Sequence, residues 1–298
     1  MSEFLTTREL AAMLRVKERK VYDLAGKGLL PVRRVTGKLL FPRDEINEWI
    51  VSSGGLDKAA PRELAESPTA LPVVIAGGHD PLLEWALRES RSEIAALFDG
   101  ALDGLRRGAG EGCIAAGLHI PESGLNSWNV ATVAKLFGDK PVVLIEWAKR
   151  TRGLMYRSDL GRSIKSLADV RDLRFQPRQP ESGSELALAG LLQREGLQKK
   201  DLRCVDAIER SETDLAMAIA AGRADVGLGV EASARQFQLE FSALVVERFD
   251  LLIWRKPYFD PPFQKLIRFC ASESFRRRAH ELGGYDITEL GAVHFNGP

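Results

Sequence analysis

From residue 72 onward, short apolar runs alternate with segments in which apolar residues recur at helical spacing. "PVVIAGG" precedes "DPLLEWALRES", "IAALF" precedes "GALDGLRRG", and "VATVAKLFG" precedes "PVVLIEWA". Each such element must cover its apolar face against a neighbour, and alternation of the two kinds favours helices packed on a parallel sheet. We therefore predict an α/β domain with largely parallel strands over residues 72–298.

The segment before this domain has a different character. "SSGGLDKAAPRELAESPTAL" is rich in Ser, Gly, Ala and Pro and has no sustained hydrophobic period, which is typical of a linker. A chain of 298 residues is long enough for two or three domains. We predict a small domain at residues 1–51, a linker at 52–71 and the large domain at 72–298.

The first fifty residues contain the signals of a compact helical unit with a hairpin. Thr6 and Glu9 have the spacing of a capping box, and Leu10, Met13 and Leu14 follow on one helical face. "KERKVYDLAGKG" predicts a second helix, joined to the first by a tight turn. "LPVRRVTGKLLFP" predicts two short strands that turn at Thr36-Gly37-Lys38, and "RDEINEWI" predicts a closing helix with Ile46, Trp49 and Ile50 facing inward.

Charge is unevenly distributed along the chain. The whole sequence carries a net charge of +1, whereas residues 1–50 contain ten Lys or Arg against seven Asp or Glu. A near-neutral total argues against a general polyanion binder, but a local basic excess is compatible with a nucleic-acid-binding module.

This N-terminal pattern resembles the excisionase-type, MerR-related winged helix-turn-helix over nearly its full length. The resemblance implies that "KERKVY" begins a recognition helix and that the hairpin is a wing contacting double-stranded DNA. Lys27 and Arg43 fit a solvated surface slightly better than a DNA contact, and Arg8 and Arg15 are left open. The candidate DNA-binding residues are Lys17, Arg19, Lys20, Tyr22, Arg33, Arg34 and Lys38.

In an open α/β sheet, ligands bind where strands end and loops lead into helix N-termini. Five such loops are rich in Gly, Ser, Thr and free backbone amides, which suit an anion: "AGGHDP", "GLHIP", "RQPESGSE", "ERSETD" and "GLGVEA". The candidate ligand-binding residues in them are Gly78, His79, Asp80, His119, Arg178, Gln179, Ser182, Gly183, Ser184, Ser211, Thr213, Val230 and Glu231.

Some of these residues also fit a purely structural role. Asp80 is expected to cap the helix that follows it, whereas "SGS" at residues 182–184 is the strongest candidate for an anion nest. Ser211, Thr213 and Glu231 fit helix capping and ligand contact equally, and His119 fits the ligand site and the interior equally.

The large domain also has a family resemblance, carried by "GGHDPLLEWAL", "AAGLHI", "RGLMYR", "SLADVRDLRFQPRQPESGSE" and "AAGRADVGLGVEA". It is similar to bacterial periplasmic-binding-protein-like domains that are often joined to a helix-turn-helix or to molybdenum-cofactor biosynthesis proteins. The resemblance implies a two-lobed type 2 fold with crossovers near residues 147–155 and 244–250. Lobe I would then comprise 72–150 and 248–298, and lobe II 153–245. Where the family shows G-S-H-D, Gly78 replaces the serine and removes one hydroxyl donor.

The resemblance implies a one-component transcriptional regulator that senses a small anionic effector, with molybdate or tungstate favoured. A small carboxylate or a molybdenum-cofactor-related metabolite is the next interpretation. An enzyme on a binding-protein fold and a constitutive DNA-binding protein are two further hypotheses for the chain. A homodimer or higher homo-oligomer is expected, because one small module contacts one half-site.

The sequence lacks the motifs that are typical of common enzymes, metal sites and membrane proteins. The sequence has no HExxH, GxSxG, P-loop or GxGxxG motif, so no enzymatic activity is expected. Its four histidines and three cysteines show no short metal-ligand spacing, so neither a metal nor a cofactor is expected. "MSEFLTTREL" does not resemble a signal peptide, and no apolar run approaches the length of a membrane span. A cytoplasmic protein without membrane contact is therefore expected.

Overall fold

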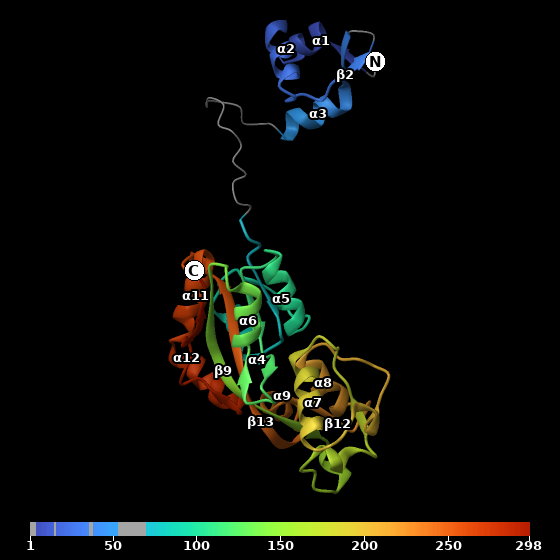
Figure 1. Ribbon diagram of the computed structural model, residues 1–298, viewed down its shortest axis with the longest axis vertical. Helices are drawn as coiled ribbons and strands as arrows, with labels where there is room; N and C mark the ends of the chain where they lie inside the picture. The colour runs from blue at the N-terminus through green and yellow to red at the C-terminus, as the bar shows by residue number, and fades with distance from the viewer. Residues whose placement is uncertain (1–3, 15, 36–37, 53–69) are drawn as a thin grey trace. The chain divides into compact units, whose positions relative to one another are not determined.

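The computed structural model describes residues 4–14, 16–35, 38–52 and 70–298 (Figure 1). The chain divides into two compact units, Met1–Thr69 and Ala70–Pro298. The predicted linker at 52–71 and the predicted turn at Thr36-Gly37 lie almost entirely outside the described residues.

The smaller unit is a helix-turn-helix beside a three-stranded antiparallel sheet of order β1-β3-β2. Its elements are β1 (Phe4–Thr6), α1 (Thr7–Met13), α2 (Glu18–Gly26), β2 (Arg33–Val35), β3 (Lys38–Pro42) and α3 (Arg43–Ser52). The expected capping box is present, because Thr6 Oγ1 accepts from Glu9 N at 3.3 Å while Glu9 Oε2 accepts from Thr6 N at 2.7 Å. The pairing of β1 with β3, which places the chain start beside the hairpin, was not predicted.

Apolar side chains from every element of this unit meet in one core. Its buried members are Leu5, Leu10, Ala11, Val21, Ala25, Leu30, Phe41 and Ile46, with Trp49 packed against them. The prediction that Met13 shares this face is wrong: its side chain is 40% exposed, because α1 ends at this residue. The side chain of Ile50 lies outside the described part of the chain.

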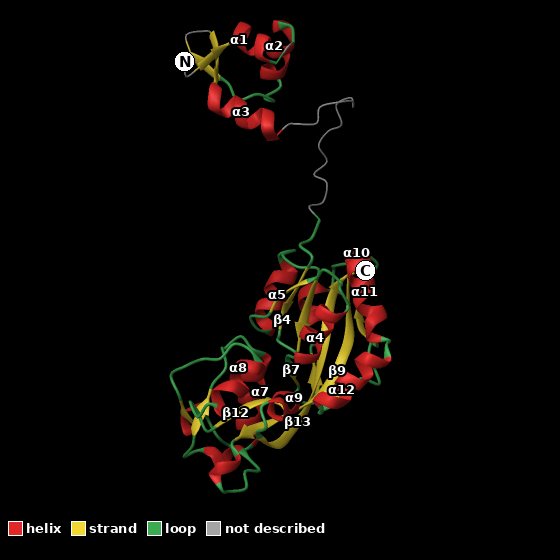
Figure 2. Cartoon of the chain, turned by 180° about the vertical axis from the view of Figure 1, so that it is seen from behind, coloured by secondary structure: helices red, strands yellow, loops and turns green. Residues whose placement is uncertain are grey.

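The larger unit is an α/β structure whose elements fall into two lobes (Figures 1 and 2). Lobe I begins with β4 (Val74–Gly77), α4 (Pro81–Glu89), β5 (Ala95–Leu97), α5 (Ala101–Ala109), β6 (Ala115–Leu118), β7 (Pro121–Glu122), β8 (Ser127–Trp128) and α6 (Val130–Phe137). Lobe II contains β10 (Arg174–Gln176), α7 (Gly183–Arg194), β11 (Arg203–Cys204), α8 (Glu212–Ala220), β12 (Val226–Val230) and α9 (Glu231–Gln236). Lobe I is completed by α10 (Arg255–Tyr258), α11 (Pro261–Cys270), α12 (Glu273–Leu282), β14 (Tyr285–Asp286) and β15 (Val293–Asn296).

Two long strands, β9 (Val142–Tyr156) and β13 (Glu240–Trp254), pass from one lobe to the other. The main path of the sheet has the order β11-β10-β12-β9-β13-β6-β4-β5. The prediction of largely parallel strands is wrong for the centre of the sheet. There, β9 and β13 are antiparallel to each other, β9 is antiparallel to β12, and β13 is antiparallel to β6. Parallel pairing is found on the two flanks. A chain that crosses between lobes and returns must run the two crossing strands in opposite directions.

Each lobe has its own apolar core on the sheet. Lobe I buries Trp147, Phe249, Phe263 and Phe275 beneath α4, α11 and α12, and lobe II buries a Leu-rich cluster beneath α7. Helix α9 joins the two, since Ala232 belongs to the lobe I core although its helix follows a lobe II strand. The lobes are therefore packed against each other.

Candidate functional site

The smaller unit presents a row of polar side chains on α2. Lys17 occupies the N-cap position, and Lys17, Arg19 and Lys20 are all exposed. Tyr22, one turn further along, has 54% of its surface exposed, whereas Val21 faces the core. The N-terminal half of this helix thus offers cations and one aromatic ring to solvent, as a recognition helix requires.

The hairpin of β2 and β3 carries the other predicted DNA contacts. Arg34 and Lys38 are exposed. Arg33 is also exposed, but its Nη2 donates to Glu45 Oε1 at 2.7 Å, which ties the hairpin to α3. The charge of Arg33 is therefore partly neutralised within the protein, which makes Arg34 and Lys38 the stronger candidates of the three for phosphate contact.

In the larger unit, oppositely charged side chains are buried together where the lobes meet. We name this group the interlobe cluster: Asp80, Arg150, Arg152, Arg178, Glu212 and Glu247, each at most 5% exposed. Burying an ion costs several kcal/mol unless an opposite charge lies close to it, so the members have to be considered through their contacts.

Asp80 anchors the lobe I end of the interlobe cluster. It caps α4 as expected, with Leu83 N donating to Oδ1 at 2.7 Å. Trp147 Nε1 donates to the same oxygen at 3.0 Å, while Arg150 Nη1 and Tyr285 Oη donate to Oδ2 at 2.9 and 2.6 Å. Both carboxylate oxygens are thereby saturated.

The two crossing strands supply the centre of the cluster. Arg150 and Arg152 lie two residues apart on β9, so their side chains share a face of the strand. Glu247 on β13 accepts from both of them, with Arg152 Nε at 2.7 Å from Oε2 and Nη2 at 2.8 Å from Oε1. The guanidinium of Arg150 also lies 4.3 Å from the centre of the Phe249 ring, a favourable cation–π geometry.

Glu212, in the first turn of α8, is the lobe II end of the cluster. Its Oε1 accepts from Arg152 Nη2 and Ser184 Oγ, each at 3.0 Å, and lies 3.1 Å from Arg178 Nη1. Its Oε2 accepts from Val230 N at 3.2 Å. One carboxylate is thus surrounded by two guanidinium groups, a hydroxyl and a backbone amide.

Burial and neighbouring charges shift the pKa values of these acids in opposite directions. Burial alone would raise the pKa values of Glu212 and Glu247, but the neighbouring arginines outweigh it and hold both pKa values well below the usual range. Burial lowers the pKa of Arg178 despite its contact with Glu212. Burial also lowers the pKa of His119, so its imidazole is neutral at pH 7.

Two histidines of lobe I touch the lobe II side of this region. His79 Nδ1 accepts from Glu212 N at 3.2 Å, and His79 Nε2 lies 3.1 Å from Glu84 Oε2. His119 Nδ1 lies 3.2 Å from Glu247 Oε2. A Cβ on Gly183 would lie 2.5 Å from His119 O, so glycine at the start of α7 allows this close approach of the lobes.

The remaining predicted ligand residues have varied surroundings. Ser182 and Ser211 are N-caps, which accept from Glu185 N at 3.1 Å and Asp214 N at 2.9 Å. Gly78 packs against the His119 ring. Thr213 is half-buried in the first turn of α8, outside the contacts that define the cluster. Glu231 forms an ion pair with Arg235 at 2.7 Å, apart from the interlobe cluster.

The 182–184 loop therefore does not present two free serine hydroxyls as an anion nest would. Ser182 Oγ donates to Gln179 O at 2.8 Å, and Ser184 Oγ accepts from Arg152 Nη1 at 2.8 Å. In the preceding loop, Arg178 Nη1 is engaged by the ion pair with Glu212 Oε1 at 3.1 Å, whereas the buried Gln179 Oε1 has no hydrogen-bond partner among the described residues.

Sequence reasoning missed the charged residues at the centre of the cluster, and with them the tyrosine that contacts Asp80: Arg150, Arg152, Glu212, Glu247 and Tyr285. A signal was present for three of them, since Arg150, Arg152 and Glu247 lie between apolar runs within long strands. A charge in the middle of a buried strand requires a partner.

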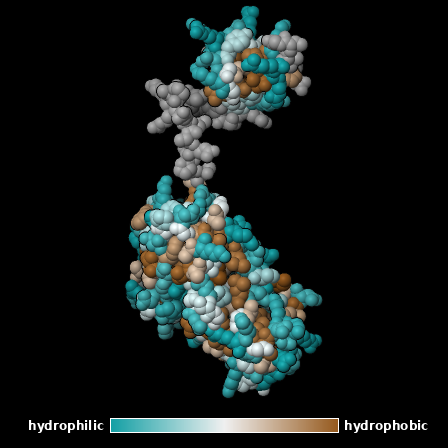
Figure 3. Space-filling view, in the orientation of Figure 1, coloured by the Kyte–Doolittle hydropathy of each residue, from teal (hydrophilic) through white to brown (hydrophobic). Residues whose placement is uncertain are grey.

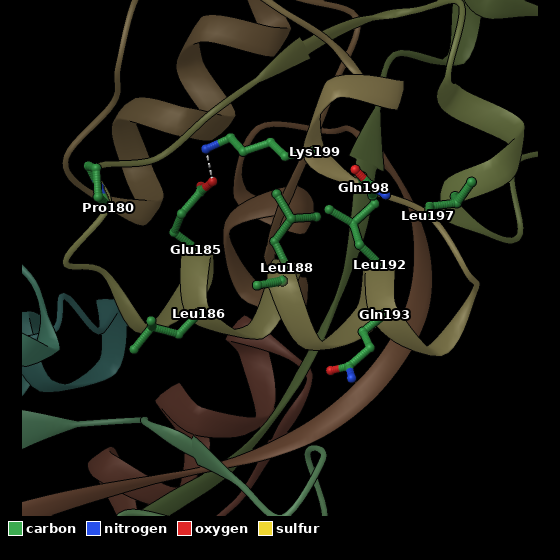
Figure 4. Close-up of a pocket in the computed structure, with 10 residues that line it drawn as sticks. Pro180, Glu185, Leu186, Leu188, Leu192, Gln193, Leu197, Gln198 and Lys199 are labelled. Atoms are coloured by element: carbon green, nitrogen blue, oxygen red, sulfur yellow. Dashed lines mark hydrogen bonds and ion pairs between the residues drawn. The ribbon is translucent and has the colours of Figure 1, made fainter.

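A separate groove of about 400 Å³ runs beside α7 (Figure 4). Its floor is apolar, and the ion pair between Glu185 and Lys199 crosses its rim. The groove is lined by Pro180, Glu185, Leu186, Leu188, Ala189, Leu192, Gln193, Leu197, Gln198 and Lys199. On the face shown in Figure 3, other exposed apolar side chains of the larger unit form patches among hydrophilic ones. An apolar floor does not suit a small anion.

Among the described residues, one group of side chains has potential metal-ligand atoms close together: those of Glu146, Asp250 and His294 lie within 4.8 Å of one another. Their atoms are engaged by the protein, because His294 Nε2 lies 2.8 Å from Glu146 Oε2 and Asp250 accepts from Asn129 Nδ2 and Arg248 Nε. Burial raises the pKa of Asp250. These contacts are within the protein and account for the closeness of the three side chains.

Comparison with known families agrees with this geometry. A helix-turn-helix domain model matches residues 4–52. A model described as the PBP superfamily domain matches residues 84–271, which is more than half of the chain. The chain belongs to the PBP superfamily. The expected α/β, two-lobed binding-protein-like fold with an N-terminal helix-turn-helix is confirmed. Within the described residues, no helix is both long and apolar enough to cross a bilayer.

Individual relatives are distant. The uncharacterized protein YvgK of Bacillus subtilis is 24% identical over 299 residues, covering 97% of this chain and 96% of the relative. The structure of PhnD1 from Prochlorococcus marinus in complex with methylphosphonate is 10% identical with a TM-score of 0.50, covering 74% of this chain and 92% of that one. A mutant of OxyR from Corynebacterium glutamicum with bound H2O2 is 14% identical with a TM-score of 0.49, covering 93% of this chain and 89% of that one.

Proposed function

We propose that this protein is a non-enzymatic, one-component transcriptional regulator whose PBP-like unit binds a small anion between its lobes. The observation that carries the proposal is the convergence of Arg150, Arg152 and Arg178 in a buried position where both lobes meet. Guanidinium groups are the preferred protein ligands of carboxylates and oxyanions, and burial strengthens their interaction with an anion.

The surrounding donors support the same ligand class. Ser184 Oγ and Val230 N both donate to the Glu212 carboxylate, which lies at the position where Arg152 and Arg178 meet. We favour a tetrahedral oxyanion of the molybdate or tungstate type, with a small carboxylate second. Either would be held by donors of lobe II and of the crossing strand β9. Because His79 of lobe I contacts the start of α8, the lobes would have to separate before the anion enters and to close afterwards.

Lobe closure supplies a mechanism for regulation. An effector that binds the closed arrangement more tightly than the open one shifts the population toward closure, and equal affinity for the two would shift nothing. In a homodimer on double-stranded DNA, such a shift would change how the two helix-turn-helix units fit two half-sites. The exposed cations of α2 and the hairpin support the DNA-binding half of this proposal.

The test is calorimetric titration of molybdate, tungstate, sulfate and acetate into the full-length protein, followed by gel-shift assays on DNA duplexes that the protein selects from a random library. We expect saturable binding of at least one anion and a change in DNA affinity. Arg178→Gln should weaken that anion at least about tenfold, a lower bound for removing one partner of a buried charge pair. Arg174→Gln is the matched control, since Arg174 pairs with Asp225 on the surface of lobe II.

Two results would contradict the proposal. Absence of binding by every anion would favour a constitutive DNA-binding protein. Binding that Arg178→Gln and Arg174→Gln affect equally would place the effector outside the interlobe cluster.

A further inference from the structure

The charges of the interlobe cluster are balanced within the protein. Three guanidinium groups face three carboxylates, those of Asp80, Glu212 and Glu247. An anion added to this group would leave a buried excess of negative charge, which is strongly unfavourable at low effective dielectric. Binding of an anion here therefore requires that one of the three carboxylates leave.

Two of the carboxylates are fixed by the fold. Asp80 caps α4 and accepts from Trp147, Arg150 and Tyr285. Glu247 lies on a crossing strand and contacts Arg150, Arg152 and His119. Withdrawal of either would uncap a helix or leave charge unpaired between the crossing strands.

Glu212 differs from them in position and in kind of contact. It belongs to the first turn of a lobe II helix, and the cap of that helix is supplied by Ser211 rather than by Glu212. Its partners are Arg152, Arg178, Ser184 Oγ and Val230 N, at 3.0 to 3.2 Å. These are the same groups that the proposed function assigns to the effector.

We propose that Glu212 is a built-in anion: its carboxylate occupies the position of the effector's anionic group, and the effector binds by displacing it. This inference rests on the proposed function, because it concerns the same site. The effector class it implies is a compact anion with at least two acceptor oxygens, which can replace the carboxylate group for group. Until it is displaced, the Glu212 carboxylate pairs with Arg152 on the crossing strand β9, while the Glu212 backbone N donates to His79 Nδ1 of lobe I at 3.2 Å.

The first test is Glu212→Gln in the full-length protein. The substitution keeps the shape of the side chain and removes its charge. The affinity for molybdate or sulfate should therefore rise at least about tenfold, because a neutral amide competes with the effector for Arg152 and Arg178 less well than a carboxylate does. Glu231→Gln is the matched control: Glu231 also lies in the first turn of a lobe II helix and pairs with an arginine. It should leave the affinity unchanged.

The second test does not depend on the identity of the effector. Glu212→Ala leaves a space the size of a carboxylate beside two arginines, so formate should raise its melting temperature more than it raises that of the wild type or of Glu231→Ala. Sodium chloride at equal ionic strength separates specific rescue from general screening. The gain in melting temperature follows from preferential binding to the folded state.

The outcomes distinguish this inference from the proposed function. If the wild type binds an anion but Glu212→Gln binds it equally or more weakly, the inference fails and the proposed function stands. If formate rescues Glu212→Ala while the wild type and Glu212→Gln bind none of the tested anions, the built-in anion stands and the effector assignment fails. If formate stabilises Glu212→Ala no more than chloride does, Glu212 is not a replaceable anion.

Discussion

Replacing Arg152 by Met should destabilise the larger unit by about 3 kcal/mol. Arg152 is fully buried and donates to Glu247, Ser184 and Glu212. Breaking a buried ion pair by removing one partner costs about 3–5 kcal/mol. Because Glu247 retains Arg150 and Glu212 retains Arg178, neither carboxylate is left without a cation, and the lower end of that range applies. Methionine fills most of the vacated volume and adds no further polar group.

For a domain of this size, about 3 kcal/mol corresponds to a fall of about 6–12 °C in melting temperature. Differential scanning calorimetry of the full-length protein would measure it on the transition of the larger unit. Arg235→Met is the control, because Arg235 is 58% exposed and pairs with Glu231 alone among the described acids; it should cost less than about 1 kcal/mol. Equal effects of the two substitutions would refute the view that the interlobe cluster contributes to stability through paired buried charge.

Two further predictions concern DNA and pH. Arg34→Glu should weaken binding to any duplex and lower the slope of log affinity against log salt by about one, because an exposed phosphate contact acts through counterion release; an unchanged slope in fluorescence anisotropy titrations would remove Arg34 from the interface. Burial lowers the pKa of His119 below its ordinary 6.5, so the unfolded chain takes up a proton first, and stability is present above pH 6.5 and is lost as the pH falls below it. His119→Gln should reduce the drop in melting temperature between about pH 7.5 and pH 5.5, whereas His280→Gln, on an exposed part of α12, should not.

Local signals in the sequence were sufficient to predict most helices and strands of the smaller unit. The capping box of Thr6 and Glu9, the buried Val21 and the hairpin strands depend on neighbours within a few residues. The same reasoning placed Met13 in the core wrongly, since helical periodicity does not say where a helix ends. The position of β1 beside β3 depends on a contact 38 residues apart in the chain, between Phe4 and Pro42.

The candidate site in the larger unit was predicted in part. The loop sequences placed His79, Asp80, Arg178 and Ser184 close to where the lobes meet, because strand ends and helix starts have sequence signatures. They did not reveal Glu247 opposite Arg150, since that pairing depends on the register of two strands separated by 97 residues. The register between strands so far apart in the sequence is set by packing, and it cannot be predicted from the residues of either strand alone.

The crossing strands that connect the two lobes also carry charged residues of the interlobe cluster. Arg150, Arg152 and Glu247 project from the same antiparallel ladder that any change in lobe angle must twist. If the lobes open as the proposed function requires, rotation of one lobe would therefore also expose the buried guanidinium groups to water, and the barrier to opening would include the work of separating charge. Such a barrier responds to dissolved ions, which stabilise charges as they become exposed. Under the proposed function, the rate of lobe opening should accordingly rise with salt even when the anions present are too weakly bound to act as effectors.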